Sequence, residues 1–590
     1  MKQIINKLLA AISAVVLICL LSCNEDKGNY DYADINLLDS INRINSIYYA
    51  ELGDTLIITP RLVFSHGDDK GEYTYKWYYA TPEGGWTQLQ EGLTFKQEVA
   101  PPIGRDVTLL FEARNTQTDI SYRKAFSLTL SPSLKGYLAL CEAENGFEID
   151  VVSFSQSKQK FSLLKNVLAK TESTIPRNGV KPIDIATSAT WSINGAPTAN
   201  KPDGSRYAVW LLTDQYTTRL SSIDFSWSPD YDIEASVEKS SYLDTAYIQK
   251  GKRIIAKKIK VTDSEGRKTW MYHVNDAGEG NWFLYQFFIP ARYFANPINV
   301  APVIESGKRW PKGPRFEPSP YLSVNSYFSS VFYDKTAHSF KYGILAYSST
   351  STNTFANAFF ADNFGTEPAG GAFSFSDPDY EDCLYMDETL RLLTAPDGCA
   401  VMKLKSGGYK YIRFSINSNA TSPVAVDNRK RASVFPSGSA IGNMKFMVNY
   451  PLSYPENPYV YYVTNDNKVW RANVSISPAV ETEITSQFIR DGYNEVTAFK
   501  YLLPQSQRSA DCPASLEKGL AVATFNPSLG KENGGKLEIF TLKDGLTGEL
   551  EIAKYPTDKE LEDYPRADGY QVTMSWPGMG KIVGLDYKKK

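Results

Sequence analysis

The residue types that carry most enzymatic chemistry are sparse in this sequence and stand far apart. A nucleophilic triad needs a histidine base within hydrogen-bond reach of a serine or cysteine, and the three histidines are His66, His273 and His338. None of them lies in an H-E-x-x-H motif or in a G-x-S-x-G setting. We interpret His66 as a solvated turn residue, and the other two as residues of the core or of a strand edge.

Carboxylates are plentiful, and their densest run is DPDYEDCLYMDE, from Asp377 to Glu388. Paired acids catalyse glycoside hydrolysis and clustered oxygens bind Ca²⁺, but this spacing does not match the EF-hand loop. We expect a solvated loop here. The sequence also lacks a CxxC or Cys/His cluster for zinc and a phosphate-binding glycine motif after a strand. It therefore predicts no enzymatic activity, metal or cofactor, with a glycoside hydrolase as the alternative.

The N-terminus carries a different chemistry, that of a processed and lipidated cysteine. Lys2 and Lys7 accompany an apolar run over residues 8–21, which is shorter than the ~20 residues of a membrane-spanning helix. This arrangement is typical of a signal peptide, which we place at residues 1–22. The run ends in LLSC, which resembles the bacterial lipobox. That resemblance implies lipidation of Cys23, whereas the alternative is a plain secretory signal with an incidental cysteine.

The residues directly behind Cys23 are polar and read NEDK. They resemble the export signal of surface lipoproteins from Gram-negative bacteria with Sus-type nutrient uptake systems. This resemblance implies an outer-membrane protein that is held by membrane lipid, through its acylated cysteine, and faces the cell exterior. The alternative is a solvated tether with chance charges. Residues 23–34 are predicted to form the lipidated tether.

Length, charge and cysteine content narrow the class of protein. A chain of 590 residues is too long for one ordinary core, so we expect two or more domains. A net charge of -3 argues against a nucleic-acid partner. Behind the lipidated residue stand Cys141, Cys383, Cys399 and Cys512, which permit three pairings. Cys383 and Cys399 flank a predicted hairpin and are the first candidates for a disulfide; free buried thiols are the alternative.

Residues 35–133 have the pattern of a β-sandwich. IYYAEL and TLIITPRLVF are β-rich runs on either side of Gly53-Asp54, a turn signal. YTYKWYYA then alternates around Trp77, and VTLLFEARN and KAFSLTLS continue the series. Short strands over about 100 residues around a central tryptophan are typical of an Ig-like sandwich.

The same segment carries a family resemblance. The GDTL turn, the YKWYY strand and the closing RKAFSLTLS strand resemble the PKD-like domain of surface lipoproteins, and CNEDKGNYDY resembles the start of that family. The resemblance covers residues 23–133, although the W-D-F-G-D-G signature of ordinary PKD domains is absent. It implies association with a Sus-type transporter barrel and its lid lipoprotein, and a peptide or glycan ligand.

From Gly136 onward, short apolar strands recur along the chain. They begin at Tyr137, Tyr207, Trp270, Tyr342, Ala400, Tyr459 and Gly519. Seven β-rich units favour a seven-bladed β-propeller over residues 134–590; six or eight blades and a pair of β-sandwiches are the alternatives. The fold class is therefore all-β, an Ig/PKD-like sandwich followed by a propeller. The final strand, KIVGLDYK, is predicted to close the ring against the first blade, and TNDN (464–467) to form a hairpin turn.

The propeller also holds the predicted ligand contacts. Exposed aromatic side chains with polar neighbours bind sugars and apolar peptide side chains. Trp282, Trp310 and Trp576 are flanked by turn residues, which predicts that they lie on loops as ligand platforms; the alternative for each is packing between blades. The sequence and the resemblance together predict an accessory binding component of an uptake system. The rival functions are an extracellular hydrolase on a propeller and a protein scaffold without a small ligand.

Overall fold

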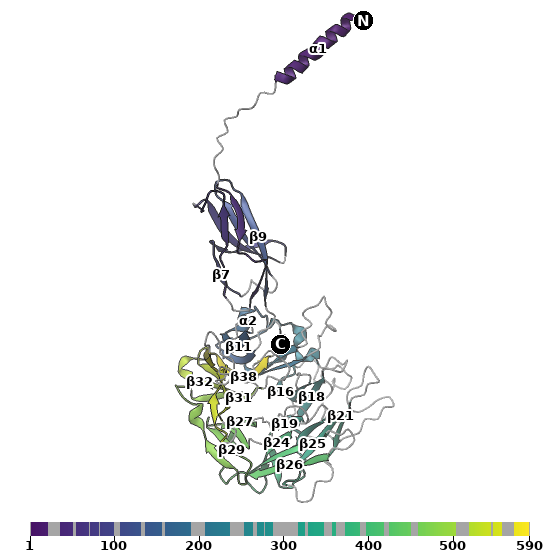
Figure 1. Ribbon diagram of the computed structural model, residues 1–590. Coiled ribbons are helices and arrows are strands. Elements are labelled where there is room, and N and C mark those ends of the chain that lie inside the picture. Colours follow the sequence, from purple (N-terminus) through teal and green to yellow (C-terminus); the bar gives the residue numbers. More distant parts are fainter. Residues whose placement is uncertain are drawn as a thin grey trace, which may run out of the picture. The chain divides into compact units, whose positions relative to one another are not determined.

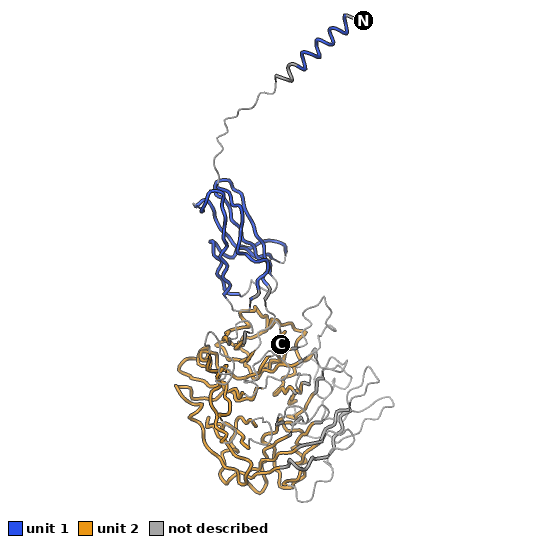
Figure 2. The backbone as a smooth tube through the Cα atoms, viewed as in Figure 1, with its two compact units in different colours: residues 1–50, 54–99, 103–130 blue, residues 51–53, 100–102, 131–590 orange. Residues whose placement is uncertain are grey.

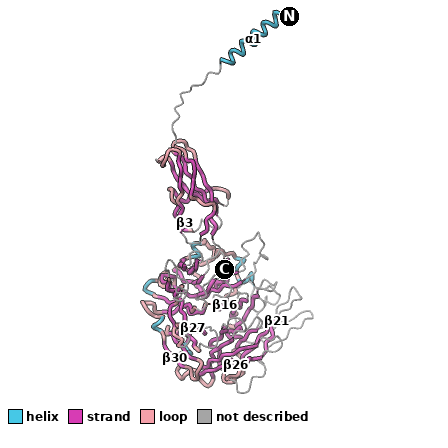
Figure 3. Tube along the Cα trace, in the orientation of Figure 1, coloured by secondary structure: helices cyan, strands magenta, loops and turns pink. Residues whose placement is uncertain are grey.

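The computed structural model is dominated by strands (Figure 3) and contains two compact units (Figure 2). One unit consists of residues 1–50, 54–99 and 103–130, and the other of residues 51–53, 100–102 and 131–590. The structure describes residues 2–21, 36–50, 55–69, 71–81, 83–99, 107–130, 136–155, 160–189, 207–222, 224–236, 253–262, 268–275, 278–286, 317–324, 329–346, 357–361, 372–389, 397–417, 424–449, 458–502, 519–543, 547–556 and 571–588.

The chain begins with helix α1 (Lys2–Leu21). Its apolar side chains, among them Ile4 and Leu8, are exposed. Within the described ranges, no helix combines the length and the apolar character that crossing a membrane requires. Cys23 and the predicted tether, residues 23–34, lie outside the described residues.

The first unit is a sandwich built around Trp77. A five-stranded sheet has the order β2-β9-β8-β5-β6, and the pairs β1-β4 and β3-β7 complete the unit. The strands are β1 (Leu38–Asn42), β2 (Ile47–Ala50), β3 (Thr55–Ile58), β4 (Arg61–Phe64), β5 (Tyr73–Ala80), β6 (Trp86–Glu91), β7 (Phe95–Glu98), β8 (Val107–Asn115) and β9 (Ser121–Leu130). The buried Trp77 ring lies 5.1 Å from that of Phe95 and 4.6 Å from that of Phe111. These rings join β5, β7 and β8, so the predicted all-β sandwich with a central tryptophan is confirmed.

The second unit contains seven antiparallel sheets of three to five strands within its described residues. In order these are β38 (Lys581–Lys588), β10 (Gly136–Ala143), β11 (Gly146–Ser155) and β12 (Lys160–Leu164); β13 (Pro182–Ala189), β14 (Tyr207–Thr213) and β15 (Thr217–Ser221); β16 (Ala256–Thr262), β17 (Lys268–Val274) and β18 (Gly280–Gln286); β19 (Pro318–Val324), β20 (Ser329–Asp334), β21 (Ser339–Ala346) and β22 (Asn357–Ala361); β23 (Tyr380–Thr389), β24 (Asp397–Leu404), β25 (Tyr409–Asn417) and β26 (Val424–Val434); β27 (Met444–Asn449), β28 (Tyr459–Thr464), β29 (Val469–Asn473) and β30 (Val480–Glu483); and β31 (Glu495–Tyr501), β32 (Leu520–Phe525), β33 (Gly535–Leu542) and β34 (Leu550–Ile552), with β37 (Ser575–Met579) also paired to β33.

The second unit also contains three shorter elements. The helix α2 (Val167–Lys170) follows β12. β35 (Lys554–Tyr555), which follows β34 in the chain, pairs with β36 (Val572–Thr573), which precedes β37. The helical content of the unit is thus small, as the sequence predicted.

The first strands of the seven sheets follow one another around a ring. Contacts join β38 to β13, β13 to β16, β19 to β23, β23 to β27, β27 to β31 and β31 to β38. The remaining step, from β16 to β19, is made by the Lys260 ammonium, which donates to the Leu322 carbonyl oxygen at 2.8 Å. Figure 1 shows β16, β19, β27, β31 and β38 in the interior and β18, β21, β26, β29 and β32 further out. We call these seven first strands the innermost strands.

The ring is closed by a sheet that combines both ends of the unit. β38 pairs with β10 along its length, from Gly136 opposite Lys588 to Glu142 opposite Lys581. In Figure 1 the yellow β38 accordingly lies beside the blue strands of the first sheet. Seven sheets joined in this way form a seven-bladed propeller, so the predicted blade number and the predicted closing strand are both confirmed.

The recurring apolar runs are the second strands of their sheets, with one exception. A second strand is paired on both edges and packed on both faces. Its sequence is therefore an almost continuous apolar run, as in β28 and β32. The exception is the run at Tyr342, which belongs to β21, the third strand of the fourth sheet. The predicted hairpin turn at 464–467 is present, and Asn467 adopts a φ of 62° there.

The acidic run from Asp377 to Glu388 is not the solvated loop that we expected. Most of it forms β23, an innermost strand. Its carboxylates meet lysines from other strands: Glu381 lies 2.6 Å from the Lys403 ammonium, and Asp387 lies 2.5 Å from that of Lys260. Because these cations neutralise the carboxylates, a run with many acids can form a strand.

Candidate functional site

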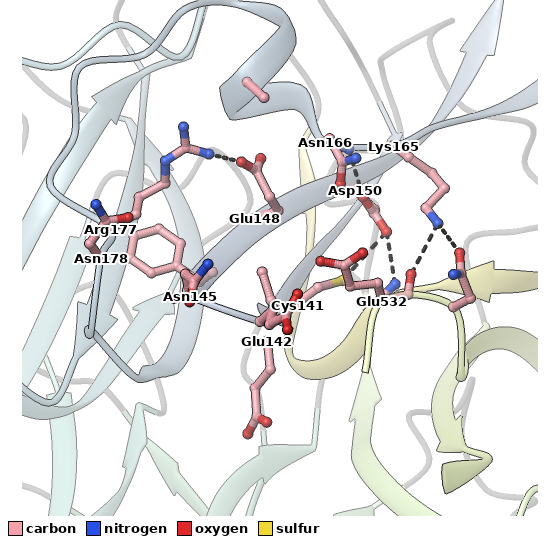
Figure 4. Close-up of a pocket in the computed structure, with 17 residues that line it drawn as sticks. Cys141, Glu142, Asn145, Glu148, Asp150, Lys165, Asn166, Arg177, Asn178 and Glu532 are labelled. Carbon is pink, nitrogen blue, oxygen red and sulfur yellow. Dashed lines mark hydrogen bonds and ion pairs between the residues drawn. The ribbon is translucent and has the colours of Figure 1, made fainter. Parts of the chain in front are cut away.

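A cavity of about 480 Å³ opens between the first and seventh sheets (Figure 4). It is bounded by the β10–β11 turn, the start of β11, α2 with its flanking residues, the turn before β33, and Gly580 before β38. The charged side chains that line it are five carboxylates and two cations: Glu142, Glu144, Glu148, Asp150, Glu532, Lys165 and Arg177. Four asparagines and few apolar side chains complete the lining, so the cavity is polar and acidic.

The tight β10–β11 turn brings the chain segments of this cavity together. Gly146 follows the turn with a φ of 148°, and a Cβ atom there would lie 2.0 Å from the Arg177 carbonyl oxygen. Only glycine fits so close an approach. The segment after α2 therefore lies directly against the start of β11, and this contact places Arg177 beside Glu148.

Asp150 fixes the floor of the cavity. Its carboxylate accepts hydrogen bonds from the backbone N–H of Asn166 at 2.9 Å and of Gly580 at 3.1 Å, and the Cys141 thiol donates to it at 3.6 Å. Burial raises the pKa of Asp150 and raises that of the Cys141 thiol well above its usual range. Both oxygens of Asp150 are occupied and the thiol stays protonated, so we interpret the two residues as structural.

The wall of the cavity offers acceptors to a ligand. Lys165 spans the two sheets, since its ammonium donates to the Glu532 carbonyl oxygen at 3.0 Å and to Asn533 Oδ1 at 2.8 Å. Figure 4 shows Arg177 and Glu148 facing each other as an ion pair. That pair uses Glu148 Oε1, whereas the buried Oε2 has no hydrogen-bond partner among the described residues.

A buried acceptor without a partner is costly, and an excess of carboxylates attracts donors and positive charge. The cavity can therefore bind a group rich in O–H or N–H donors, such as sugar hydroxyls or an amine. A metal ion is a poorer match, because the described residues contain no cluster of three or more His, Cys, Asp or Glu side chains that could hold one.

The structure does not place the predicted tryptophan platforms on exposed loops. Trp282 lies in β18 with no exposed surface, and its indole N–H donates to the Ser319 carbonyl oxygen at 3.0 Å. Trp576 lies in β37, buried at 8% exposure, with its ring 6.0 Å from that of Tyr137. For both, the prediction of an exposed platform was wrong and packing between blades is correct. Trp310 lies outside the described residues.

The predicted Cys383–Cys399 disulfide is not formed. Both thiols are free and buried. The two cysteines lie on neighbouring strands but out of register, because Cys383 is opposite Met402 and Cys399 is opposite Asp387. Cys141 is a free buried thiol as well, and Cys512 lies outside the described residues.

The histidines do not meet one another at a site. His273 Nδ1 lies 3.0 Å from the Ile255 carbonyl oxygen, and His338 Nδ1 lies 2.6 Å from that of Glu381. These contacts tie β17 and the turn before β21 to neighbouring backbone. His66 is exposed in a turn of the first unit.

Sequence reasoning missed the cavity, because its residues come from distant parts of the chain. Asp150 and Gly580, which are hydrogen-bonded, are 430 positions apart. The local signal was modest: Glu142, Glu144 and Glu148 surround the short turn at Asn145. Only the closure of the ring by β38 turns this acidic hairpin into one wall of a cavity.

The fold and the cavity define the class as an all-β protein with an N-terminal sandwich and a seven-bladed propeller that carries a polar cavity. A model of the PKD-like family matches residues 23–202. This match supports the predicted PKD-like resemblance of the N-terminal part, and it extends beyond the sandwich into the second sheet of the propeller.

No curated protein matches the chain. Among solved structures, the chain is similar to a quinoprotein alcohol dehydrogenase-like protein from Bacteroides thetaiotaomicron. The two are 12% identical with a TM-score of 0.32, and the match covers 93% of this chain and 100% of that one. The propeller assignment therefore rests on the strand pairing described above.

Proposed function

We propose that this protein is a lipid-anchored surface lipoprotein that binds a glycan or an oligopeptide as an accessory component of a Sus-type uptake system. The observation that carries the binding role is the acceptor-rich cavity of Figure 4, with its unpartnered Glu148 oxygen. The PKD-like match and the propeller fit a surface binding or scaffold protein. The lipobox-like LLSC and the acidic residues behind it support the anchor and the surface location.

Binding is favoured over hydrolysis by the state of the carboxylates. A glycosidase needs two carboxyl groups that can reach the scissile bond, one of them as the acid. Asp150 has the raised pKa of an acid, but backbone N–H groups occupy both of its oxygens. Glu148 forms an ion pair with Arg177. The engagement of these two carboxylates within the protein supports a binding role over hydrolysis.

The experiment that tests this function is incubation of the purified full chain with glycan and oligopeptide mixtures. We expect retention of one of the two classes without change in its mass. Turnover would contradict the binding role and support the hydrolase. If neither class is retained, co-purification with a Sus-type transporter barrel would support the scaffold function instead.

Substitution of Glu148 by glutamine is expected to weaken binding of the retained ligand about tenfold. The substitution keeps the shape of the side chain but replaces a hydrogen bond to a charged acceptor, which contributes about 1.5–3 kcal/mol, by one to a neutral acceptor, which contributes about 0.5–1.5 kcal/mol. Calorimetric titration of the retained ligand measures the change. The control is Glu551→Gln, which changes an exposed carboxylate on β34 outside the cavity. Equal affinities of the two variants would contradict the assignment of the cavity.

Substitution of Cys23 by alanine is expected to release the protein from the membrane completely. Several acyl chains on one residue hold a protein far more tightly than one, at about 0.8 kcal/mol per buried CH₂ group. Without the thiol no lipid can be attached. Membrane fractionation and labelling with a radioactive fatty acid check the result, with Cys141→Ala as the control. Lipid-labelled, membrane-bound Cys23→Ala protein would disprove the anchor.

A further inference from the structure

Charged side chains from five of the seven innermost strands meet within the ring. They are Asp184 on β13, Lys258 and Lys260 on β16, Asp387 on β23, Lys500 on β31 and Asp586 on β38. Lys258 interacts electrostatically with groups on β13, β23 and β31, so these side chains approach one another across the ring. We call these six residues the axial cluster.

Most members of the axial cluster are held by partners inside the protein. Lys260 lies 2.5 Å from Asp387 and donates to a backbone carbonyl oxygen at 2.8 Å. Lys500 donates to the Leu585 carbonyl oxygen at 2.8 Å. Asp586 accepts hydrogen bonds from the backbone N–H and the hydroxyl group of Thr187, the latter at 2.9 Å.

Lys258 differs from the other two lysines. Its ammonium lies over the ring of Tyr321, 4.3 Å from the ring centroid. Within the described ranges, no hydrogen bond and no ion pair holds this ammonium. The side chain of Lys258 is partly exposed.

Lys258 and Lys500 show what a counter-charge does at this place. Burial lowers the pKa of Lys500, but Asp184 and Asp586 oppose this effect and leave the pKa raised above its ordinary value. Burial also lowers the pKa of Lys258, to about 8, and Lys260 adds to the effect. Asp387 and Asp184 also act on Lys258, but they do not offset its burial, and neither of them forms an ion pair with its ammonium among the described residues.

We propose that Lys258 anchors a second binding site, inside the ring of innermost strands, for the carboxylate group of a ligand. A carboxylate would complete the hydrogen bonds of the ammonium, and Tyr321 would supply an aromatic wall beside it. The three aspartates of the axial cluster repel any anion, and they repel a doubly charged phosphate more strongly than a singly charged carboxylate. The site does not depend on the cavity of Figure 4, which contains none of these residues.

The test uses the full chain and two matched pairs of probes. One pair is D-glucuronate and D-glucuronamide, and the other is N-acetylalanine and N-acetylalanine amide. We expect the acid of at least one pair to bind at least tenfold more tightly than its amide in a calorimetric titration at pH 7. The pair that responds identifies a sugar acid or a peptide C-terminus as the source. Equal binding of acid and amide in both pairs, or no binding, would overturn the proposal.

Variants at two neighbouring positions of β16 locate the site. Lys258→Met is expected to abolish the preference for the acid, and Lys258→Arg to retain it. The matched control Lys257→Met removes an exposed lysine next in the chain and should bind as the unmodified protein does. Retention of the preference in Lys258→Met would overturn the proposal. Glu148→Gln should keep it, so failure of the proposed cavity function and failure of this site are distinguishable.

The pH dependence gives a readout that needs no variant. The titratable groups that face Lys258 are Asp184, Lys260, Tyr321, Cys383, Asp387 and Lys500. Because the pKa of Lys258 is about 8, the ammonium is charged below that pH and loses its proton above it. The preference for the acid should therefore be full at pH 6.5 and fall at least tenfold by pH 9.5. A preference that is unchanged over this range would contradict the role of Lys258, even if Lys258→Met fails to fold.

Discussion

Removal of residues 581–590 is expected to prevent the second unit from folding at 25 °C. This deletion takes away β38, which is both the closing strand of the first sheet and an innermost strand of the ring. Ile582 and Leu585 are almost fully buried, and their burial alone contributes about 3–6 kcal/mol. That is comparable with the total stability of a domain, about 5–15 kcal/mol, and the β10 ladder is lost in addition.

Circular dichroism and limited proteolysis of the truncated chain would measure this effect. We expect the unfolding transition of the second unit to be absent while that of the sandwich remains. A synthetic peptide with the sequence of residues 581–590 should restore protection from proteolysis, whereas a scrambled peptide should not. A truncated chain that unfolds cooperatively at the original temperature would show that β38 does not close the ring.

Substitution of Trp282 by alanine is expected to lower the free energy of unfolding of the second unit by about 3–5 kcal/mol. The side chain has no exposed surface, its ring lies 5.2 Å from that of Tyr272, and its indole N–H donates to the Ser319 carbonyl oxygen. The truncation leaves a cavity and an acceptor without a donor. Denaturant unfolding followed by tryptophan fluorescence and circular dichroism gives the difference.

The control for this prediction is Leu529→Ala, which shortens a half-exposed apolar side chain in the same unit. Its effect should stay within about 0.5 kcal/mol. If Trp282→Ala lost ligand binding at unchanged stability, the interpretation of Trp282 as a core residue would be wrong. Its original interpretation as a ligand platform would then be supported.

The fold could be predicted from the sequence to the extent that its second strands are apolar. Strands such as β28 and β32 are buried on both faces and stand out as short runs, and their number gives the number of blades. Apart from β38, the innermost strands were not recognised in the sequence. β16 carries Lys258 and Lys260 and β23 carries several acids, and such strands resemble loops until their counter-charges on other blades are known.

The tryptophans show a second limit of prediction from the sequence. Gly280 and Asn281 precede Trp282 and gave it the local signature of a turn, yet they are the first two residues of β18. A turn signal marks where a turn ends but does not place the next residue outside the core. The predicted Cys383–Cys399 disulfide was wrong for a related reason. Two cysteines on paired strands can form a disulfide only if the register places them opposite each other, and the register here is shifted by bulges such as the one between Cys383 and Tyr385.

The cavity could not be predicted, because it is made by long-range closure. Its acidic hairpin is local in the sequence, but its opposite wall comes from Glu532, Asn533 and Gly580. No periodicity or motif connects segments that lie so far apart. The axial cluster is hidden for the same reason, since its six members come from five strands.

The closure of the first sheet by β38 also sets the timing of folding during synthesis. A ribosome makes β10 early and β38 last, so the free edge of β10 exists for almost the whole time of translation of the unit. An unpaired strand edge invites pairing with other chains, and the long loop that must close makes the final step slow. The newly synthesised chain therefore keeps an unpaired β10 edge until β38 emerges, and that edge belongs to the strand that later forms part of the wall of the cavity.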